Sequence, residues 1–274
     1  MPHFKTFDGL NIFYSDQGQG LPVLCLPGLT RTTADFDDVA PHLHGCRIIR
    51  MDMRGRGQSD WDDNWQNYTL PVECQDVIAL MDHLELEKAA ILGTSRGGLQ
   101  AMGLAATHKD RLLGVALNDI GPEIDLSGLA IIMTYLGRRP NAKTYEEAAL
   151  ALKALYSKAF PTVTDDIWQR EARKNFIETS DGLDITYDPK LRNAAEAAGT
   201  DLPDLWPFFD AMSGLPLAAI RGANSDLFSQ ETLSKMQDRR PDMVAVNVPD
   251  RGHVPFLNEL EAVAAITAWL GKMQ

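Results

Sequence analysis

The chain has 274 residues, 45% of them hydrophobic, and carries 26 lysines and arginines against 38 aspartates and glutamates, a formal net charge of −12. This length suits one large α/β domain with an insertion, or two small domains. The acidic balance argues against nucleic acid and against anionic membrane surfaces as partners, because both attract basic patches.

The sequence also indicates the cellular compartment of the protein. No window approaches the roughly 18 apolar residues of a membrane span, and residues 1–5 lack the long apolar stretch of a signal peptide. The three cysteines, Cys25, Cys46 and Cys74, are odd in number and lack metal-ligand spacing. We therefore expect buried free thiols in a cytoplasmic protein. The sequence does not decide between a monomer and a homodimer.

The first two-fifths of the chain alternates between predicted strands and helices. It opens with a β-hairpin through Asp8-Gly9, with strands at residues 4–7 and 11–15. Further strands are predicted at residues 22–27, 46–53, 88–93 and 113–118, and helices at residues 34–43, 71–84 and 99–106. Such alternation predicts a parallel sheet with helices on both faces.

From residue 124 to residue 213 the pattern changes, and no convincing strand is present. Helices are predicted at residues 126–136, 145–160, 165–177, 189–198 and 204–212. Alternation then resumes, with strands at residues 216–221 and 243–248 and helices at residues 230–237 and 258–273. We predict a core domain of residues 1–123 and 214–274 and an inserted helical cap of residues 124–213. The cap is expected over the carboxyl-terminal edge of the sheet, where open α/β sheets bind ligands.

A serine at G-x-S-x-G spacing lies between a predicted strand and a predicted helix, in Gly93-Thr94-Ser95-Arg96-Gly97. A strand that turns sharply into a helix leaves little room, so side chains at the two glycine positions would collide with their neighbours. The turn strains the serine backbone and exposes its hydroxyl at a helix N-terminus, which favours developing negative charge. We predict that Ser95 is a catalytic nucleophile.

Such a serine needs a base, an orienting acid and donors for the oxyanion. His253 follows the predicted strand 243–248 and is the predicted base. Asp226, which follows the strand 216–221, is the preferred acid, because Ser, Asp and His then each follow a different parallel strand. Asp119, at the end of the strand 113–118, is the alternative acid, since a carboxylate there can also reach the histidine.

The oxyanion donors are expected to be two backbone N–H groups. One belongs to Arg96, directly after the nucleophile, and the other to Leu29 in the turn at residues 27–30. The Arg96 side chain opposes the helix dipole and needs a counter-ion. We expect it to pair with Asp119 or Glu123.

Together these segments resemble the α/β-hydrolase superfamily, in the capped serine-hydrolase branch that includes carboxylesterases, enol-lactonases and C–C-bond hydrolases. The matching segments are residues 26–29, 52–60, 93–97, 221–226 and 252–253. The resemblance implies the α/β-hydrolase fold, a mostly parallel eight-stranded sheet flanked by helices with an inserted helical cap. It also identifies residues 52–60 as a structural loop rather than a phosphate-binding site. Pro27 and Arg96 replace a histidine and a methionine common in the family, which leaves both backbone donors in place.

The expected activity is hydrolysis of small to medium apolar carboxylic esters through an acyl-enzyme intermediate, with no metal or organic cofactor. Lactone opening ranks second because it uses the same acyl chemistry. C–C hydrolysis ranks third, because those enzymes typically have a tryptophan after the catalytic histidine and this chain has Val254. A ligand-binding module without activity ranks last, since all three catalytic positions hold competent residues.

The predicted cap is rich in large apolar side chains. Most of them are expected to pack between helices, and the rest to line an apolar pocket. These residues are Ile131, Ile132, Met133, Tyr135, Phe160, Trp168, Trp206, Phe208 and Phe209. The cap arginines Arg138, Arg139, Arg170 and Arg173 are candidates for binding a substrate carboxylate, although solvated helix faces are the favoured interpretation.

Overall fold

The computed structural model describes residues 2–199 and 203–273. Within these residues, eight strands form one sheet in the order β1-β2-β4-β3-β5-β6-β9-β10, and β7 and β8 form a separate hairpin. The strands are β1 (His3–Lys5), β2 (Asn11–Gly18), β3 (Leu21–Leu26), β4 (Cys46–Met51), β5 (Ala89–Thr94), β6 (Leu112–Asn118), β7 (Phe176–Thr179), β8 (Gly182–Ile185), β9 (Leu217–Gly222) and β10 (Val244–Val248). Only the pairs β1–β2 and β2–β4 of the described sheet are antiparallel, so the predicted eight-stranded, mostly parallel sheet is confirmed.

The helices follow the strands as the alternation predicts. They are α1 (Leu70–His83), α2 (Arg96–Thr107), α3 (Leu126–Tyr135), α4 (Tyr145–Tyr156), α5 (Asp165–Asn175), α6 (Leu191–Ala198), α7 (Trp206–Asp210), α8 (Gln230–Arg239) and α9 (Leu260–Leu270). Short 3-10 turns are η1 (Thr33–Phe36), η2 (Ala40–His42), η3 (Trp65–Asn67) and η4 (Lys109–Arg111). Among the helices of the described residues, none combines the length and apolar character needed to cross a membrane.

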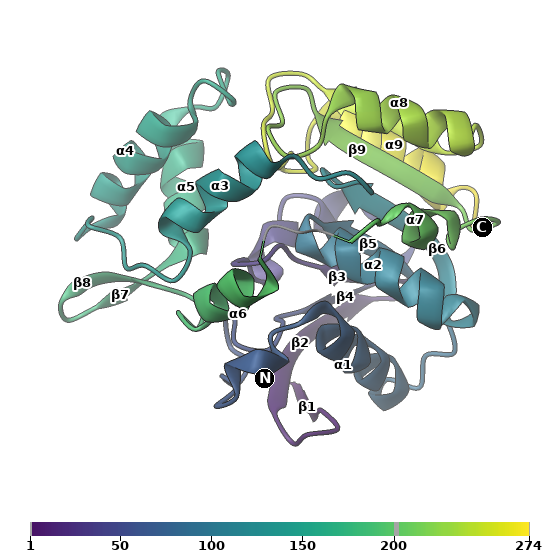
Figure 1. Ribbon diagram of the computed structural model, residues 1–274, viewed down its shortest axis with the longest axis horizontal. Helices are drawn as coiled ribbons and strands as arrows, with labels where there is room; N and C mark the ends of the chain where they lie inside the picture. The colour runs from purple at the N-terminus through teal and green to yellow at the C-terminus, as the bar shows by residue number, and fades with distance from the viewer. Residues whose placement is uncertain (1, 200–202, 274) are drawn as a thin grey trace.

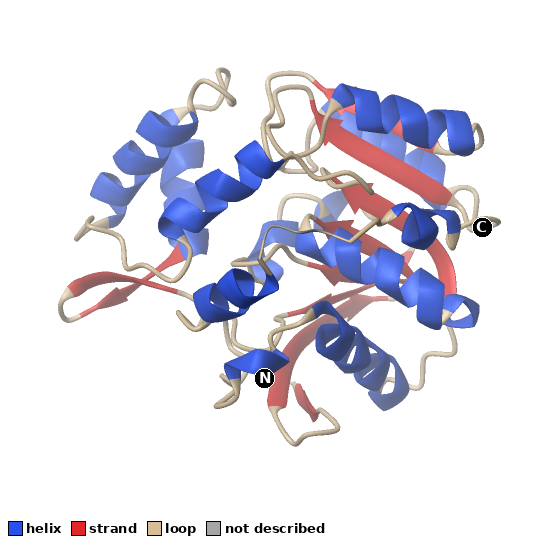
Figure 2. Ribbon diagram, viewed as in Figure 1, coloured by secondary structure: helices blue, strands red, loops and turns tan. Residues whose placement is uncertain are grey.

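Helices cover both faces of the sheet because its strands are apolar on both faces. In β3, Leu24 packs with the layer of α1, α2, α7 and α8, whereas its neighbour Cys25 packs with η1 and α9 on the other face. Figure 2 shows these helices in front of and behind the strands. α9 presents one apolar side at helical spacing. Its buried residues are Ala262, Ala265, Ile266, Trp269 and Leu270.

Between β6 and β9 the chain leaves the sheet. There, α3 to α6 and the β7–β8 hairpin lie beside it, on the left of Figure 1. α4 and α5 have a small apolar core of their own, which includes Ala149, Trp168 and Ala172. The expectation of no strand in this region is wrong, because β7 and β8 pair around residues 180–181. Apolar and β-branched residues on both sides of Asp181-Gly182 are the signal for this hairpin.

α7 belongs to the layer on the sheet rather than to the outer helices. Phe209 and Met212, in α7 and just after it, are fully buried in the same apolar cluster as residues of α2 and β6, and Figure 1 places α7 beside α2. The end of the predicted cap thus packs on the sheet. The domain boundaries at residues 124 and 213 stay a prediction.

The prediction of one helix at residues 34–43 is wrong, because η1 and η2 form two separate turns there. Pro41, in the first turn of η2, has no backbone N–H and restricts the residue before it, which disfavours a continuous helix. Thr32 caps η1, because its side chain accepts a hydrogen bond from the Ala34 backbone N–H.

Candidate active site

Ser95 lies at the sharp turn between β5 and α2. Its φ is 50°, in the left-handed region, and its backbone N–H donates to the Asn118 carbonyl on the neighbouring β6 at 2.9 Å. A Cβ atom added at Gly93 would lie 2.5 Å from the backbone of Gly97, and one at Gly97 would collide with the Leu26 carbonyl oxygen. The turn therefore needs both glycines, and it strains the serine at its apex.

His253, in the loop after β10, connects Ser95 to a buried carboxylate. Its Nε2 atom lies 2.9 Å from Ser95 Oγ, and its Nδ1 atom lies 2.8 Å from Asp119 Oδ2. The buried Asp119 carboxylate also accepts hydrogen bonds from the Gly222 backbone N–H at 2.7 Å and from the Ser225 hydroxyl at 2.6 Å. These donors fix the carboxylate so that it can orient the imidazole ring.

The preferred prediction of Asp226 as this acid is wrong, and the alternative, Asp119, is the residue that contacts His253. β6 pairs directly with β5, so the residue after β6 lies next to the turn that carries Ser95. In the loop after β9, Ser225 faces the site, whereas Asp226 is exposed and its carbonyl oxygen accepts from the Ser127 hydroxyl. Both aspartates follow strands at the same sheet edge, and the course of the loop decides between them.

The two predicted oxyanion donors are available in the structure. Leu29 lines the same cavity as Ser95, and Arg96 begins α2 directly after it. Within the described part of the chain, neither backbone N–H has a hydrogen-bond partner. The first N–H groups of a helix have no partner inside the helix, which leaves them free for a ligand oxygen.

A buried carboxylate on α1, Glu73, joins the segments that carry these donors. Arg96 Nε donates to Glu73 Oε2 at 2.7 Å, and Arg56 Nη1 lies 2.8 Å from Glu73 Oε1. Arg56 Nε in turn donates to the Leu29 carbonyl at 2.9 Å. Burial by itself raises the pKa of Glu73, but the charges of Arg96 and Arg56 outweigh it and hold the pKa at about 2.

The expected pairing of Arg96 with Asp119 or Glu123 is therefore wrong. Asp119 is occupied by His253, and Glu123 pairs with Lys235 at 3.1 Å. Glu73 is the partner because α1 lies beside α2 on the same face of the sheet, as Figure 1 shows. The sequence gives a weak signal for this contact, since Glu73 lies one turn before buried apolar positions of the same helix.

The loop at residues 52–60 has the structural role that the resemblance implies. Arg54 is fully buried and forms ion pairs with Asp8, Asp62 and Asp76 at 2.6 to 2.9 Å. Asp52 accepts backbone hydrogen bonds from Thr33 and Gln58. These contacts tie the loop to α1 and to the start of η1.

A cavity of about 600 Å³ lies between this sheet edge and the outer elements α3, α4, α5, β7 and β8. Ser95 and His253 both line it, and its volume is in the range of small-molecule sites. Of the large apolar residues singled out from the sequence, Ile132, Tyr135, Phe160 and Trp168 line the cavity. The others, Ile131, Met133, Trp206, Phe208 and Phe209, are not part of its lining.

Two tyrosines bring polar groups into this lining. Tyr135 on α3 and Tyr156 at the end of α4 both line the cavity. Burial raises the pKa of both phenols, so both are neutral at physiological pH. The cavity thus combines an apolar wall with neutral hydrogen-bonding groups.

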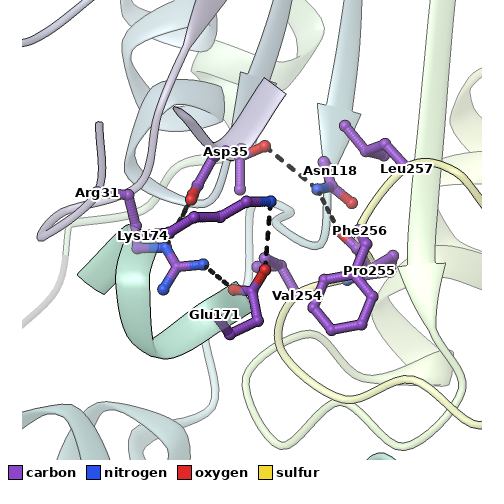
Figure 3. A pocket seen from close by; sticks show the side chains of 10 residues that line it. Arg31, Asp35, Asn118, Glu171, Lys174, Val254, Pro255, Phe256 and Leu257 are labelled. Carbon is purple, nitrogen blue, oxygen red and sulfur yellow. Dashed lines mark hydrogen bonds and ion pairs between the residues drawn. The ribbon is translucent and has the colours of Figure 1, made fainter. Parts of the chain in front are cut away.

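Figure 3 shows the charged cluster that attaches α5 to the core. Arg31 pairs with Asp35 and with Glu171 at 2.8 Å each. Lys174 pairs with Glu171 at 3.2 Å and with Asp38 at 2.7 Å. Burial opposes the charge on Arg31, but the carboxylates of Asp35 and Glu171 outweigh it and raise the pKa of the guanidinium. The positive charge of Arg31 is therefore balanced by its own partners.

A serine on a strained strand–helix turn, with a histidine and a buried aspartate at one edge of a mostly parallel sheet, is the arrangement of an α/β hydrolase. A family model described as alpha/beta hydrolase fold matches residues 22–260. The chain therefore belongs to the α/β-hydrolase family and is a hydrolase.

Individual relatives agree with this assignment. A protein of Cupriavidus necator named 3-hydroxybutyrate-oligomer hydrolase is 36% identical over 252 residues, which cover 88% of this chain and 85% of the relative. The 2-(acetamidomethylene)succinate hydrolase of Mesorhizobium japonicum is 27% identical over 92% of this chain and 88% of its own. A solved α/β hydrolase of Novosphingobium aromaticivorans has a TM-score of 0.93 at 37% identity, and the match covers 99% of this chain and 97% of the other.

Proposed function

We propose that this chain is a carboxylic ester hydrolase in which Ser95 is the nucleophile, His253 the general base and acid, and Asp119 the orienting carboxylate. The observation that carries the proposal is the continuous pair of contacts from Ser95 Oγ to His253 Nε2 at 2.9 Å and from His253 Nδ1 to Asp119 at 2.8 Å. A serine hydroxyl becomes nucleophilic when a base at this distance can take its proton.

The proposed reaction proceeds in two halves. His253 removes the proton of Ser95 Oγ as this oxygen attacks the ester carbonyl, and the backbone N–H groups of Leu29 and Arg96 stabilise the oxyanion. The alcohol leaves with the proton from His253, and the acyl group stays on Ser95. Water, activated by His253, then releases the acid and restores the serine. These steps use two backbone donors, three side chains and water.

The lining of the cavity favours substrates with an apolar body. Residues of the predicted cap, including Ile132, Phe160 and Trp168, contribute this surface, and we propose that residues 124–213 act as the cap that selects the substrate. The Cupriavidus necator relative is named for an oligomer of a hydroxy acid, and such units are joined by ester bonds. Short oligoesters of hydroxy acids are therefore the first substrates to test, beside simple esters.

Two other reactions rank below ester hydrolysis. A lactone uses the same acyl chemistry and differs only in a tethered leaving alcohol, so it ranks second. C–C hydrolysis ranks third, because Val254 lines the cavity where the enzymes of that class typically have a tryptophan.

We also propose a cytoplasmic location, since the described Cys25, Cys46 and Cys74 are all buried free thiols.

The test is turnover of p-nitrophenyl butyrate, a 3-hydroxybutyrate dimer, an enol-lactone and a dienol-acid cleavage product by the wild-type protein and by Ser95→Ala. We expect the esters to be preferred and Ser95→Ala to lose roughly 10⁴-fold or more in kcat. A fluorophosphonate is expected to label Ser95. Near-full ester hydrolysis by Ser95→Ala would rule out the mechanism, and a dienol acid turning over about tenfold faster than the esters would reverse the ranking.

A further inference from the structure

The charged side chains that line the cavity are almost all paired. Arg31 and Glu171 pair with each other at 2.8 Å, within the charged cluster of Figure 3. Arg139 lines the cavity and pairs with Asp184 at 3.1 Å. Each of these charges already has a partner, so none of them needs a ligand for neutralisation.

Arg138 is different. It lines the same cavity from the segment that follows α3, and its side chain is exposed. Among the described residues its guanidinium forms no ion pair and no hydrogen bond, and only its backbone N–H is bonded, to the Tyr135 carbonyl. The exposed Asn141 lines the cavity close by in the chain, and its amide also has no partner among the described residues.

The other two arginines that the sequence offers as carboxylate ligands lie elsewhere. Arg170 pairs with Asp38 at 3.2 Å, and Arg173 lies over the Tyr145 ring and 4.0 Å from Glu146. Neither lines the cavity. Arg170 and Arg173 therefore fit the interpretation that these arginines lie on solvated helix faces. Of the four cap arginines, Arg138 alone both lines the cavity and carries an unpaired charge.

We propose that Arg138 binds a carboxylate of the substrate, so that the preferred esters carry a free acid group remote from the ester that is cleaved. An arginine binds a carboxylate with two parallel hydrogen bonds, which gives direction as well as charge. The net charge of the whole chain is −12. The unpaired positive charge of Arg138 therefore differs in sign from the net charge of the chain, and it attracts an anionic group to this part of the cavity. This inference rests on the proposed ester hydrolysis at Ser95.

The experiment compares the 3-hydroxybutyrate dimer with its terminal primary amide, which has the same shape and the same ester but no charge. In the wild-type protein, kcat/KM for the acid is expected to exceed that for the amide. In Arg138→Gln this ratio falls about tenfold to a hundredfold, the usual effect of one lost charged hydrogen-bond pair. The loss lies mainly in KM, because a group remote from the reacting bond binds the ground state and the transition state alike.

Two matched variants complete the design. Arg138→Lys keeps the charge without the forked geometry and is expected to recover part of the ratio. Arg173→Gln removes a cap arginine outside the cavity and is expected to keep the wild-type ratio. An unchanged ratio in Arg138→Gln, or a wild-type preference for the amide, overturns the proposal.

A binding measurement separates this inference from the proposed function. Calorimetric titration of the dimer into Ser95→Ala, with and without Arg138→Gln, needs no turnover. Weaker binding of the acid in the double variant, with the amide bound alike by both, supports the role of Arg138. Equal binding of the acid by both variants overturns it. Absence of ester turnover by the wild-type protein, by contrast, overturns the proposed function.

Discussion

The orienting acid is the residue on which the sequence and the structure differ most. Asp119 accepts from three groups, the His253 imidazole, the Gly222 backbone and the Ser225 hydroxyl, whereas Asp226 is exposed. Such a buried, fully bonded carboxylate is suited to hold one tautomer of the imidazole. A substitution at each aspartate therefore tests the assignment directly.

We predict that Asp119→Asn lowers kcat for an activated ester about 10⁴-fold, as expected when the tautomer of the base is wrong. The amide NH₂ of asparagine can donate to His253 Nδ1, which then leaves the proton on Nε2, where it blocks proton transfer from Ser95. Asp226→Asn is the matched control and is expected to stay within about twofold of wild type. The reverse result in steady-state kinetics would restore Asp226 as the acid.

The structure brings together Ser95 and His253, two predicted residues whose positions depend on local geometry. Ser95 needs only its own strand–turn–helix segment, and His253 needs only its place after the last strand. The choice between Asp119 and Asp226 depends on how the loop at residues 222–226 turns, and that loop directs Ser225 inward. A one-residue change of direction in a loop leaves no periodic pattern in the sequence.

At the scale of elements, helix α1 holds in place the two segments whose backbone N–H groups are the proposed oxyanion donors. Glu73 contacts both Arg96, at the start of α2, and Arg56, which holds the Leu29 carbonyl. Removing the Glu73 charge leaves the buried Arg56 and the half-buried Arg96 without this counter-ion. Leaving a buried charge unpaired costs far more stability than the net contribution of the pair itself.

We predict that Glu73→Gln lowers the free energy of unfolding by roughly 3–5 kcal/mol. It is also expected to lower kcat about 10- to 100-fold, because Leu29 and Arg96 lose a common support and loss of one oxyanion donor alone costs about 10²-fold or more. Urea unfolding and ester turnover measure the two effects. The exposed Glu87→Gln, in the turn after α1, is the matched control. Unchanged kcat in a folded Glu73→Gln would contradict the link between α1 and the donors.

Elements with strong periodic patterns are predicted well, and those set by short local signals are not. The sheet strands and α1, α2, α8 and α9 lie close to their predicted ranges because buried apolar residues repeat along them. The β7–β8 hairpin spans only residues 176–185, too few for a clear alternation. Residues 34–43 look helical by composition, and Pro41, inside η2, disfavours one continuous helix there.

At the scale of the whole molecule, the buried Glu73 carboxylate contributes a pH-dependent part of the stability. The pKa of Glu73 is about 2 in the folded protein against an ordinary value of 4.5. A lowered carboxyl pKa stabilises the folded state fully above the unfolded value, and this contribution is lost as the pH falls toward the folded value.

We therefore predict that the stability difference between wild type and Glu73→Gln is constant near neutral pH and narrows as the pH falls from 4.5 toward 2. Urea unfolding at a series of pH values measures it. A difference that stays constant through this range, or that widens on acidification, would show that the Glu73 carboxylate is not held in its charged form by the arginines.

The register of the two central strands has a consequence for how such an enzyme changes over time. Thr94 and Asn118 are partners in the β5–β6 ladder, so Ser95 and Asp119, which follow them, are held by one pair of hydrogen-bonded strands. The outer helices α3 to α6 begin only after Asp119. Evolution can therefore lengthen, shorten or replace those helices, and with them the choice of substrate, while the spacing of the reacting groups is inherited unchanged.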